Sequence, residues 1–297
     1  MAKKKIQGTG TALVTPFKKN GAVDEHALRE LVDWQIKSKV EFLVPCGSTG
    51  ESATMTRGER KSVIEMVFQQ ANGRVPVVAG TGTNSTADSI HMTKDAKQIG
   101  VDTVLLVGPY YNKPTQEGFF QHFRTIAEEC DVKVVLYNVP GRTGSTINAE
   151  TTLRLSEEVE NVIAIKEASN NMELIMQIIR HKPKNFAVLS GEDSFTLPII
   201  SCGGEGVISV VSNEVPKEFS EMVRFALAGN KVKANELHYK LFGLMKANFI
   251  ESNPIPVKTA LWMMGKIEEN FRLPLVKMSN ENKLKLKKIL KELKLVK

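Results

Sequence analysis

Short apolar runs recur eight times along the chain. Each is followed by a cluster of glycine, serine, asparagine or proline and then by a segment of helical period. Several runs are apolar nearly throughout, which is typical of parallel strands buried on both faces. The pattern predicts eight strand–helix units. The predicted strands are residues 11–14, 41–45, 75–79, 103–107, 133–137, 162–166, 187–190 and 206–211.

Helix-start signals follow four of these runs. Asp24, Thr115 and Asn171 each precede apolar residues at helical spacing, and each is a residue type that caps helix N-termini. Thr56 and Glu59 have the spacing of a capping box. These signals predict helices after the first, second, fourth and sixth strands.

Eight units at intervals of about 20 to 35 residues predict an α/β fold, a (β/α)8 TIM barrel. An open doubly wound sheet is the alternative. It is less favoured because residues 8–10 (GTG) precede the first predicted strand and lack the third glycine of a dinucleotide-binding turn. From about residue 230 the chain has helical period, with breaks at Pro254, Pro256 and Pro274. We expect a catalytic barrel over residues 1–230 and a C-terminal helical domain over residues 231–297.

Charge is concentrated at the two ends of the chain. The 297 residues carry a formal net charge of +7, of which Lys3, Lys4 and Lys5 contribute +3 and residues 283–297 contribute +6. The remainder is slightly acidic. A basic tail can bind RNA or anionic lipid. Here Leu286, Leu290 and their apolar neighbours form a stripe at helical spacing, which favours a helix docked on the protein with its lysines in water.

Three scattered cysteines and no C-x-x-C pair predict a reducing compartment. The N-terminal lysines precede no apolar signal region, and no run approaches the ~18 apolar residues of a membrane span. We therefore expect a cytoplasmic protein. No phosphate-binding loop, no i,i+4 histidine pair and no G-x-S-x-G elbow is present, so the sequence predicts neither a metal site nor a serine hydrolase.

Lys166 is the most informative residue, because it ends an apolar run whose side chains should lie inside the barrel. Burial disfavours a charged amine and lowers its pKa. A neutral amine at the barrel mouth can form a Schiff base with a carbonyl compound, which serves as an electron sink for carbon–carbon chemistry. The alternative is a structural lysine paired with Glu167 or Glu192.

Other polar residues follow neighbouring strands. The phenol of Tyr137 could move protons beside the amine, or its ring could simply pack in the core. Ser48 and Thr49 lie in a glycine-flanked turn that could hold a carboxylate or merely link strand to helix. Arg142 could grip a carboxylate or remain solvated.

Taken together, five segments resemble the dihydrodipicolinate synthase family, which belongs to the pyruvate-dependent aldolases. They are residues 47–52 (GSTGES), 107–114 (VGPYYNKP), 137–144 (YNVPGRTG), 165–167 (IKE) and 206–209 (GVIS). The resemblance runs from about Gly8 to the final helices, with the motifs in the family's order and spacing. It implies a TIM barrel with a helical C-terminal domain, usually a homotetramer. The implied reaction condenses pyruvate with L-aspartate 4-semialdehyde in diaminopimelate and lysine biosynthesis, with no cofactor and no nucleic-acid or membrane partner.

The resemblance also implies roles for individual residues. Lys166 would form the Schiff base with pyruvate. Tyr137 would donate and accept protons in a relay with Ser48 and Tyr111, the latter reaching in from a partner subunit. The implied substrate-binding residues are Thr49, Gly191, the Ile208 backbone and Arg142, which would bind the carboxylate of the semialdehyde.

Two departures from the family pattern affect these expectations. The synthases commonly carry two threonines where this chain has Ser48 and Thr49, and the GSTGE segment is also typical of N-acetylneuraminate lyases. Arg142 favours the synthase, because the lyases lack an arginine there.

The second departure concerns feedback by lysine. A possible allosteric lysine site comprises Ser52, Ala53, Asn84, Asp88 and Tyr110. Lysine-inhibited members often carry histidines where this chain has Arg57 and Arg60, and a glutamate where it has Asp88. Added positive charge and a shorter carboxylate disfavour a ligand with two ammonium groups, so we expect weak or absent inhibition.

Overall fold

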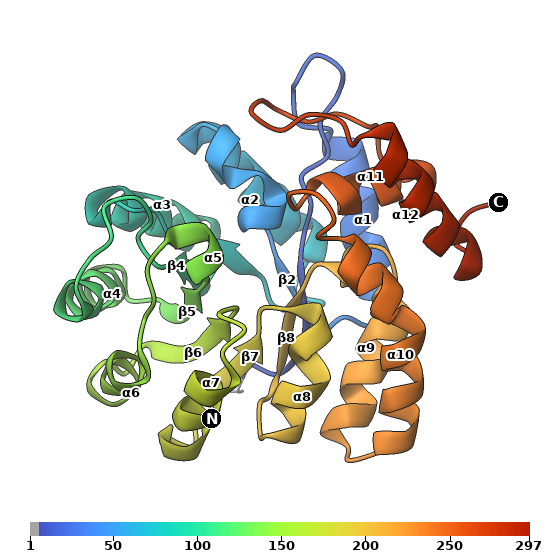
Figure 1. The fold of residues 1–297 in the computed structure, drawn as a ribbon. Coiled ribbons are helices and arrows are strands. Elements are labelled where there is room, and N and C mark those ends of the chain that lie inside the picture. Colours follow the sequence, from blue (N-terminus) through green and yellow to red (C-terminus); the bar gives the residue numbers. More distant parts are fainter. Residues whose placement is uncertain (1–5) are drawn as a thin grey trace.

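Eight parallel strands form the centre of the molecule. The computed structural model describes residues 6–297, so Lys3, Lys4 and Lys5 lie outside the described residues. The strands pair in the order β2-β1-β8-β7-β6-β5-β4-β3, and a parallel bridge from Leu43 to Val77 joins β2 to β3 (Figure 1). The predicted (β/α)8 barrel is confirmed, and the open-sheet alternative is wrong. The strands are β1 (Gly8–Ala12), β2 (Phe42–Val44), β3 (Val78–Gly80), β4 (Thr103–Val107), β5 (Lys133–Asn138), β6 (Val162–Glu167), β7 (Ala187–Ser190) and β8 (Gly206–Ser209).

A helix follows every strand and covers the outside of the barrel, and one extra turn, α5, lies between β5 and α6. Three further helices follow α9 and lie together on one side of the barrel, drawn in orange to red in Figure 1. The helices are α1 (Glu25–Lys37), α2 (Arg57–Ala71), α3 (Thr86–Ile99), α4 (Gln116–Cys130), α5 (Pro140–Thr143), α6 (Ala149–Glu158), α7 (Met172–His181), α8 (Thr196–Ser201), α9 (Pro216–Leu227), α10 (Lys231–Ala247), α11 (Ile255–Met263) and α12 (Asn280–Glu292).

The predicted helix starts are confirmed. The side chains of Asp24, Thr115 and Asn171 accept hydrogen bonds from backbone amides in the first turns of α1, α4 and α7. Thr56 and Glu59 form both hydrogen bonds of the capping box at α2. Local polar signals therefore fix where these helices begin.

The first strand begins three residues earlier than predicted, so residues 8–10 lie inside β1 rather than before it. The apolar pattern missed this start because β1 consists of small and hydroxyl-bearing residues. Gly8 pairs with Gly206 of β8, and a Cβ atom on Gly206 would lie 2.0 Å from the Gly8 carbonyl oxygen. The barrel closes here through direct backbone contact, which apolar side chains would prevent.

The boundaries of β8 and β3 also differ from the prediction. β8 ends at Ser209, not at residue 211, because the carboxylate of Asp193 accepts hydrogen bonds from the amides of Val210 and Val211. Those amides are therefore unavailable to the strand ladder. β3 begins at Val78, after a proline at position 76 that has no amide hydrogen to donate to a strand ladder.

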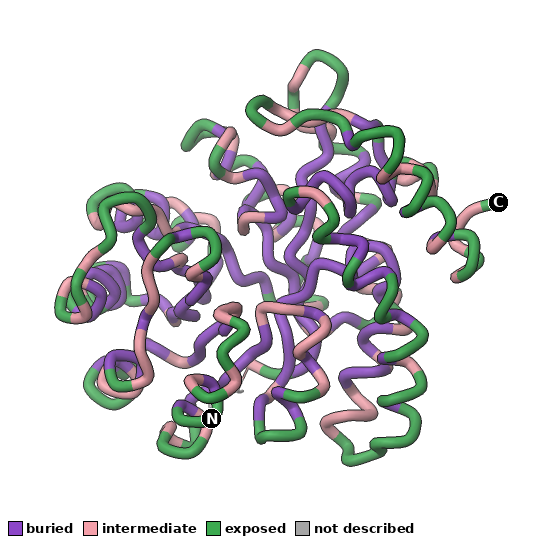
Figure 2. Tube along the Cα trace, viewed as in Figure 1, coloured by how far each residue is buried: buried purple, intermediate pink, exposed green. Residues whose placement is uncertain are grey.

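Side chains of the strands alternate between two apolar layers. Val135, Ala164 and Ile208 belong to the cluster inside the barrel, whereas Leu136 and Ile165 belong to the cluster between strands and helices. The strands are buried along nearly their whole length (Figure 2). This alternation decides which side chains point into the barrel.

The last three helices share an apolar core with the barrel helices. Phe219 of α9, Leu244 of α10 and Leu286 and Leu290 of α12 belong to one buried cluster. The basic tail is thus part of a docked helix, as the apolar stripe predicted. Pro256 does not break a helix but lies in the first turn of α11, where its missing amide hydrogen costs nothing.

α10 begins at Lys231, but the division of the chain into domains after residue 230 stays a prediction. Over residues 6–297, none of the helices combines the length and apolar character needed to cross a bilayer.

The backbone contact at Gly206 predicts a sharp effect of adding one methyl group. Gly206 has a φ of +152° and no space for a Cβ atom. We expect Gly206→Ala to lower the free energy of unfolding by ~2 kcal/mol or more in urea denaturation. Gly243 in α10 has nothing within 4 Å of its Cβ position, so Gly243→Ala should be neutral or stabilising. Equal stability of the two variants would contradict the closure of the barrel at this point.

Candidate functional site

Lys166 and Tyr137 lie side by side inside the carboxyl end of the barrel. They are paired in the register of β6 with β5, and both follow inward-pointing residues two positions earlier. The side chains of Lys166 and Tyr137 are 5% and 6% exposed. Lys166 Nζ lies 4.3 Å from the centre of the Tyr137 ring. The structure therefore brings together an amine and a phenol, as the sequence predicted.

The Lys166 amine has no carboxylate partner among residues 6–297. Glu167 instead accepts hydrogen bonds from Asn138 Nδ2 at 3.0 and 3.2 Å and from the Ser169 amide at 2.7 Å. Glu192 Oε1 accepts from the Ser194 hydroxyl at 3.2 Å. The interpretation of Lys166 as the partner of Glu167 or Glu192 is thus wrong. Burial raises the pKa of Glu167, because a charged carboxylate is costly in the barrel interior.

Gly191 lies next to Lys166, and Ile208 lies in the barrel interior. A Cβ atom on Gly191 would lie 3.1 Å from Lys166 Cε and 2.6 Å from the Ala168 Cβ atom, so only glycine leaves the lysine side chain its space. Ile208 is fully buried in the same interior cluster as Tyr137. Gly191 therefore adjoins the amine, and Ile208 shares the interior of the barrel with Tyr137.

A small cavity of about 40 Å³ joins Tyr137 to the loop after β2. Ser48 and Ser52 of that loop and Cys46 line it together with Tyr137. The Tyr137 hydroxyl forms no hydrogen bond within the described chain, so its proton is available to a ligand. Burial raises the pKa of Cys46 to about 12, which keeps this thiol protonated and unreactive.

The C-terminal segment, residues 231–297 from the start of α10, contacts the two other predicted substrate-binding residues. Asn253, between α10 and α11, donates from Nδ2 to the hydroxyl oxygen of Thr49 at 3.0 Å. Its backbone carbonyl accepts from Arg142 Nη2 at 3.2 Å. Arg142 is exposed on α5, so this contact is what orients its otherwise solvated guanidinium. No sequence pattern indicated Asn253, because it is 204 residues from Thr49.

The same segment holds the loop after β2 through a buried ion pair. Lys258 of α11 and Glu51 are both fully buried and form a short ion pair. Glu51 has a φ of +52° and turns the backbone two residues after Thr49. The Lys258 ammonium also lies 4.5 Å from the centre of the Phe17 ring. Burial lowers the pKa of Lys258, and the Glu51 carboxylate opposes that shift.

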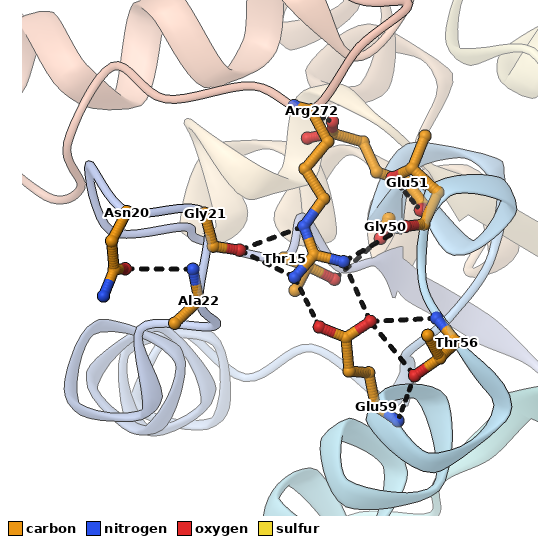
Figure 3. A network of polar contacts seen from close by, with 10 residues as sticks. Thr15, Asn20, Gly21, Ala22, Gly50, Glu51, Thr56, Glu59 and Arg272 are labelled. Atoms are coloured by element: carbon orange, nitrogen blue, oxygen red, sulfur yellow. Dashed lines mark hydrogen bonds and ion pairs between the residues drawn. The ribbon is translucent and has the colours of Figure 1, made fainter.

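Arg272 adds a second anchor to this loop (Figure 3). Its guanidinium donates to Glu59 Oε1 at 2.5 Å, to the Gly21 carbonyl at 2.7 Å and to the Thr54 carbonyl at 3.1 Å. The Arg272 amide donates to Glu51 Oε2 at 3.3 Å. The hydrogen bond from Arg272 lowers the pKa of Glu59 to about 2. Arg272 thus binds Glu51, at the start of the stretch that follows the Ser48 turn, and Glu59, in the first turn of α2.

Tyr111 does not join the other predicted catalytic residues within one chain. Its side chain is 90% exposed, and its backbone φ is +69°. Such a φ is uncommon for a tyrosine.

The predicted allosteric residues lie on consecutive loops at the same end of the barrel. Ser52 and Ala53 follow the Ser48 turn, Asn84 and Asp88 are at the start of α3, and Asn112 beside Tyr110 donates to the Asn84 carbonyl at 2.9 Å. Arg57 is paired with Asp95 at 2.6 Å. Arg60 is 9% exposed and donates to the Gly80 carbonyl at 3.0 Å. The guanidinium of Arg60 therefore brings positive charge into the interior, whereas Asp95 largely neutralises the charge of Arg57.

Over residues 6–297, no group of three or more histidine, cysteine, aspartate or glutamate side chains is arranged to hold a metal ion.

Comparisons with known proteins agree with this geometry. Residues 5–293 match the model of the dihydrodipicolinate synthetase family. A 4-hydroxy-tetrahydrodipicolinate synthase of Koribacter versatilis is 53% identical over 97% of this chain and 96% of its own length. The crystal structure of dihydrodipicolinate synthase from Aquifex aeolicus is 47% identical, with a TM-score of 0.96 over 98% of this chain and 99% of that one. A structure described as a monomeric dihydrodipicolinate synthase variant is 44% identical, with a TM-score of 0.96 over 98% of each chain.

The buried Glu51–Lys258 pair predicts a large effect of removing one partner. Lys258→Met leaves a buried carboxylate without its cation, and we expect the free energy of unfolding to fall by ~3–5 kcal/mol. The double variant Glu51→Gln with Lys258→Met has no buried charge at this point and should recover part of that loss. Urea denaturation measures both.

The exposed pair of Lys285 with Glu281 is the matched control, because Lys285 is 57% exposed. Lys285→Met should change stability by no more than ~0.5 kcal/mol. If Lys258→Met were as mild as Lys285→Met, the pair would not hold the loop.

Proposed function

Because the chain belongs to the dihydrodipicolinate synthetase family, we propose that its synthase activity is carried by a Schiff base between pyruvate and Lys166. The enzyme is a 4-hydroxy-tetrahydrodipicolinate synthase, a lyase of the Schiff-base aldolase type. Its substrates are pyruvate and L-aspartate 4-semialdehyde, and its product leads to diaminopimelate and lysine. One observation carries the assignment to Lys166: a buried amine without a carboxylate partner, beside a phenol, at the carboxyl end of a barrel strand.

The proposed chemistry begins with the lysine nitrogen. Lys166 Nζ attacks the ketone carbon of pyruvate, and loss of the carbonyl oxygen as water gives the iminium ion. The positive nitrogen withdraws electrons, so a proton leaves the methyl group and an enamine forms. The enamine carbon then attacks the aldehyde carbon of the semialdehyde, which makes the new carbon–carbon bond, turns the aldehyde oxygen into a hydroxyl group as it takes up a proton, and restores the iminium ion on Lys166. The amino group of the semialdehyde attacks the iminium carbon, closes a ring and releases Lys166 as the free amine. No metal or organic cofactor takes part in this proposal.

Tyr137 is the proposed proton carrier, because these steps take up and release protons beside the lysine. Its ring centre is 4.3 Å from Lys166 Nζ, and Tyr137 and Ser48 line the same cavity. Ser48 would relay protons between Tyr137 and Tyr111 of a partner subunit. Thr49, Gly191 and the Ile208 backbone would surround the pyruvate part, and Arg142 would bind the carboxylate of the semialdehyde.

We propose a homotetramer in the cytoplasm as the working form. The support for an assembly is that the 90% exposed ring of Tyr111 belongs to a segment that resembles the family's motif, in which this tyrosine reaches into the site of a partner subunit. The three cysteines are free, in keeping with a reducing compartment.

Substitution of the two central residues tests the mechanism. Lys166→Arg keeps the positive charge but cannot form the Schiff base, so kcat should fall by ~1000-fold or more. Tyr137→Phe should lower kcat by ~100-fold or more, because proton transfer loses its carrier. Tyr239→Phe removes a hydroxyl from a 74% exposed tyrosine and should leave kcat unchanged. Turnover by Lys166→Arg near the wild-type rate would exclude the proposed role of Lys166.

The choice of acceptor separates the synthase from an N-acetylneuraminate lyase. We expect pyruvate to condense with L-aspartate 4-semialdehyde and not with N-acetylmannosamine, and Arg142→Ala to raise the KM for the semialdehyde by ~10-fold or more. Product formation followed by mass spectrometry measures both acceptors. Turnover of the sugar alone would make the lyase assignment correct.

Feedback is the third point to test, with L-lysine added to the steady-state assay. We expect little loss of rate at millimolar lysine, because Arg60 carries a buried positive charge beside the proposed lysine site and Asp88 is a short carboxylate. Asp88→Glu should increase the sensitivity to lysine, whereas Asp88→Asn should not. Half-inhibition of the wild type by sub-millimolar lysine would contradict this account.

A further inference from the structure

Asn253 is a residue of the C-terminal segment that touches the barrel site directly. It lies between α10 and α11, is 5% exposed and is assigned no role in the mechanism above. Its side-chain Nδ2 donates to Thr49 Oγ1 at 3.0 Å, and its Oδ1 has no hydrogen-bond partner in the described part of the chain. The bond to Thr49 is therefore the single side-chain hydrogen bond of this residue within residues 6–297.

The direction of this hydrogen bond decides what Thr49 can do. Because Thr49 Oγ1 accepts from Asn253, its own hydroxyl proton must point elsewhere. No acceptor for that proton is found in the described chain. Thr49 is 3% exposed, so the proton lies in a largely desolvated place where an incoming anion would be its acceptor.

The backbone of the same residue touches the other substrate region. The Asn253 carbonyl accepts from Arg142 Nη2 at 3.2 Å, and the remaining nitrogens of that guanidinium stay available to a carboxylate. One residue thus contacts both the residue proposed for pyruvate and the residue proposed for the semialdehyde.

We propose that Asn253 is a positioning residue that turns the Thr49 hydroxyl into a donor toward the pyruvate carboxylate and steadies Arg142 for the semialdehyde carboxylate. The inference rests on the proposed function. The effects of Asn253 on the two substrates can be separated, because its contact with Thr49 uses the side chain and its contact with Arg142 uses the backbone carbonyl. Side-chain variants should therefore affect pyruvate more than the semialdehyde.

Three variants test the direction of the hydrogen bond. Asn253→Ala removes the donor, so the pyruvate concentration for half-maximal borohydride trapping should rise ~10-fold, with kcat within ~3-fold of wild type. The carboxylate of Asn253→Asp can only accept hydrogen bonds. It accepts the one from the Thr49 hydroxyl and repels the pyruvate carboxylate, so the pyruvate concentration for half-maximal trapping should rise ~100-fold. Asn270→Ala is the control, because Asn270 also donates from the C-terminal segment to the barrel, to the Phe17 carbonyl at 3.0 Å, without touching Thr49. It should leave pyruvate binding unchanged.

A double-variant cycle distinguishes positioning from a general loosening of the fold. In a Thr49→Val background, Asn253→Ala should add no further change in pyruvate binding, because the hydroxyl it orients is gone. If the fold-changes in pyruvate binding of the two single variants multiply in the double variant, the proposal is overturned. It is also overturned if Asn253→Asp binds pyruvate as tightly as the wild type. If the wild type itself traps no pyruvate, the proposed function fails. If the wild type is trapped and all Asn253 variants match it, only the role of Asn253 fails.

Discussion

The register of β5 against β6 is the constraint on which the site depends. It pairs Tyr137 with Lys166, and the period of two along each strand turns both side chains into the barrel. A slip of one residue in either strand would send one of them outward into the layer beneath the helices. The apolar interior around Val135, Ala164 and Ile208 opposes such a slip, because those residues would move to the wrong face as well. Fold and chemistry are therefore set by the same alternation.

The site also depends on the C-terminal segment, which fixes the position of the loop after β2. Asn253 holds Thr49, Lys258 pairs with Glu51, and Arg272 ties Glu59 to the Gly21 carbonyl. Each contact joins residues more than 200 positions apart, and together they fix the loop that carries Ser48 and Thr49. Burial makes the Lys258–Glu51 pair a strict constraint, since neither charge can exist there alone.

The sequence predicted what depends on local pattern. The eight units, the caps at Asp24 and Thr56 and the inward direction of Lys166 all follow from residues within one turn or one strand. The start of β1 was missed because backbone contact between Gly8 and Gly206 leaves no apolar signal. Asn253 and the partner of Glu51 were also missed, because a contact across 200 residues has no spacing to read. The exposed side chain of Arg142 gave no sign that Asn253 orients it.

Reduction of the enzyme with borohydride in the presence of pyruvate tests the central claim most directly. Reduction fixes the Schiff base as a stable secondary amine, and peptide mapping by mass spectrometry locates it. The account predicts one pyruvate-derived adduct, on Lys166, and none on Lys258, which is buried but paired with Glu51. An adduct on another lysine, or no stable mass gain on Lys166, would contradict it.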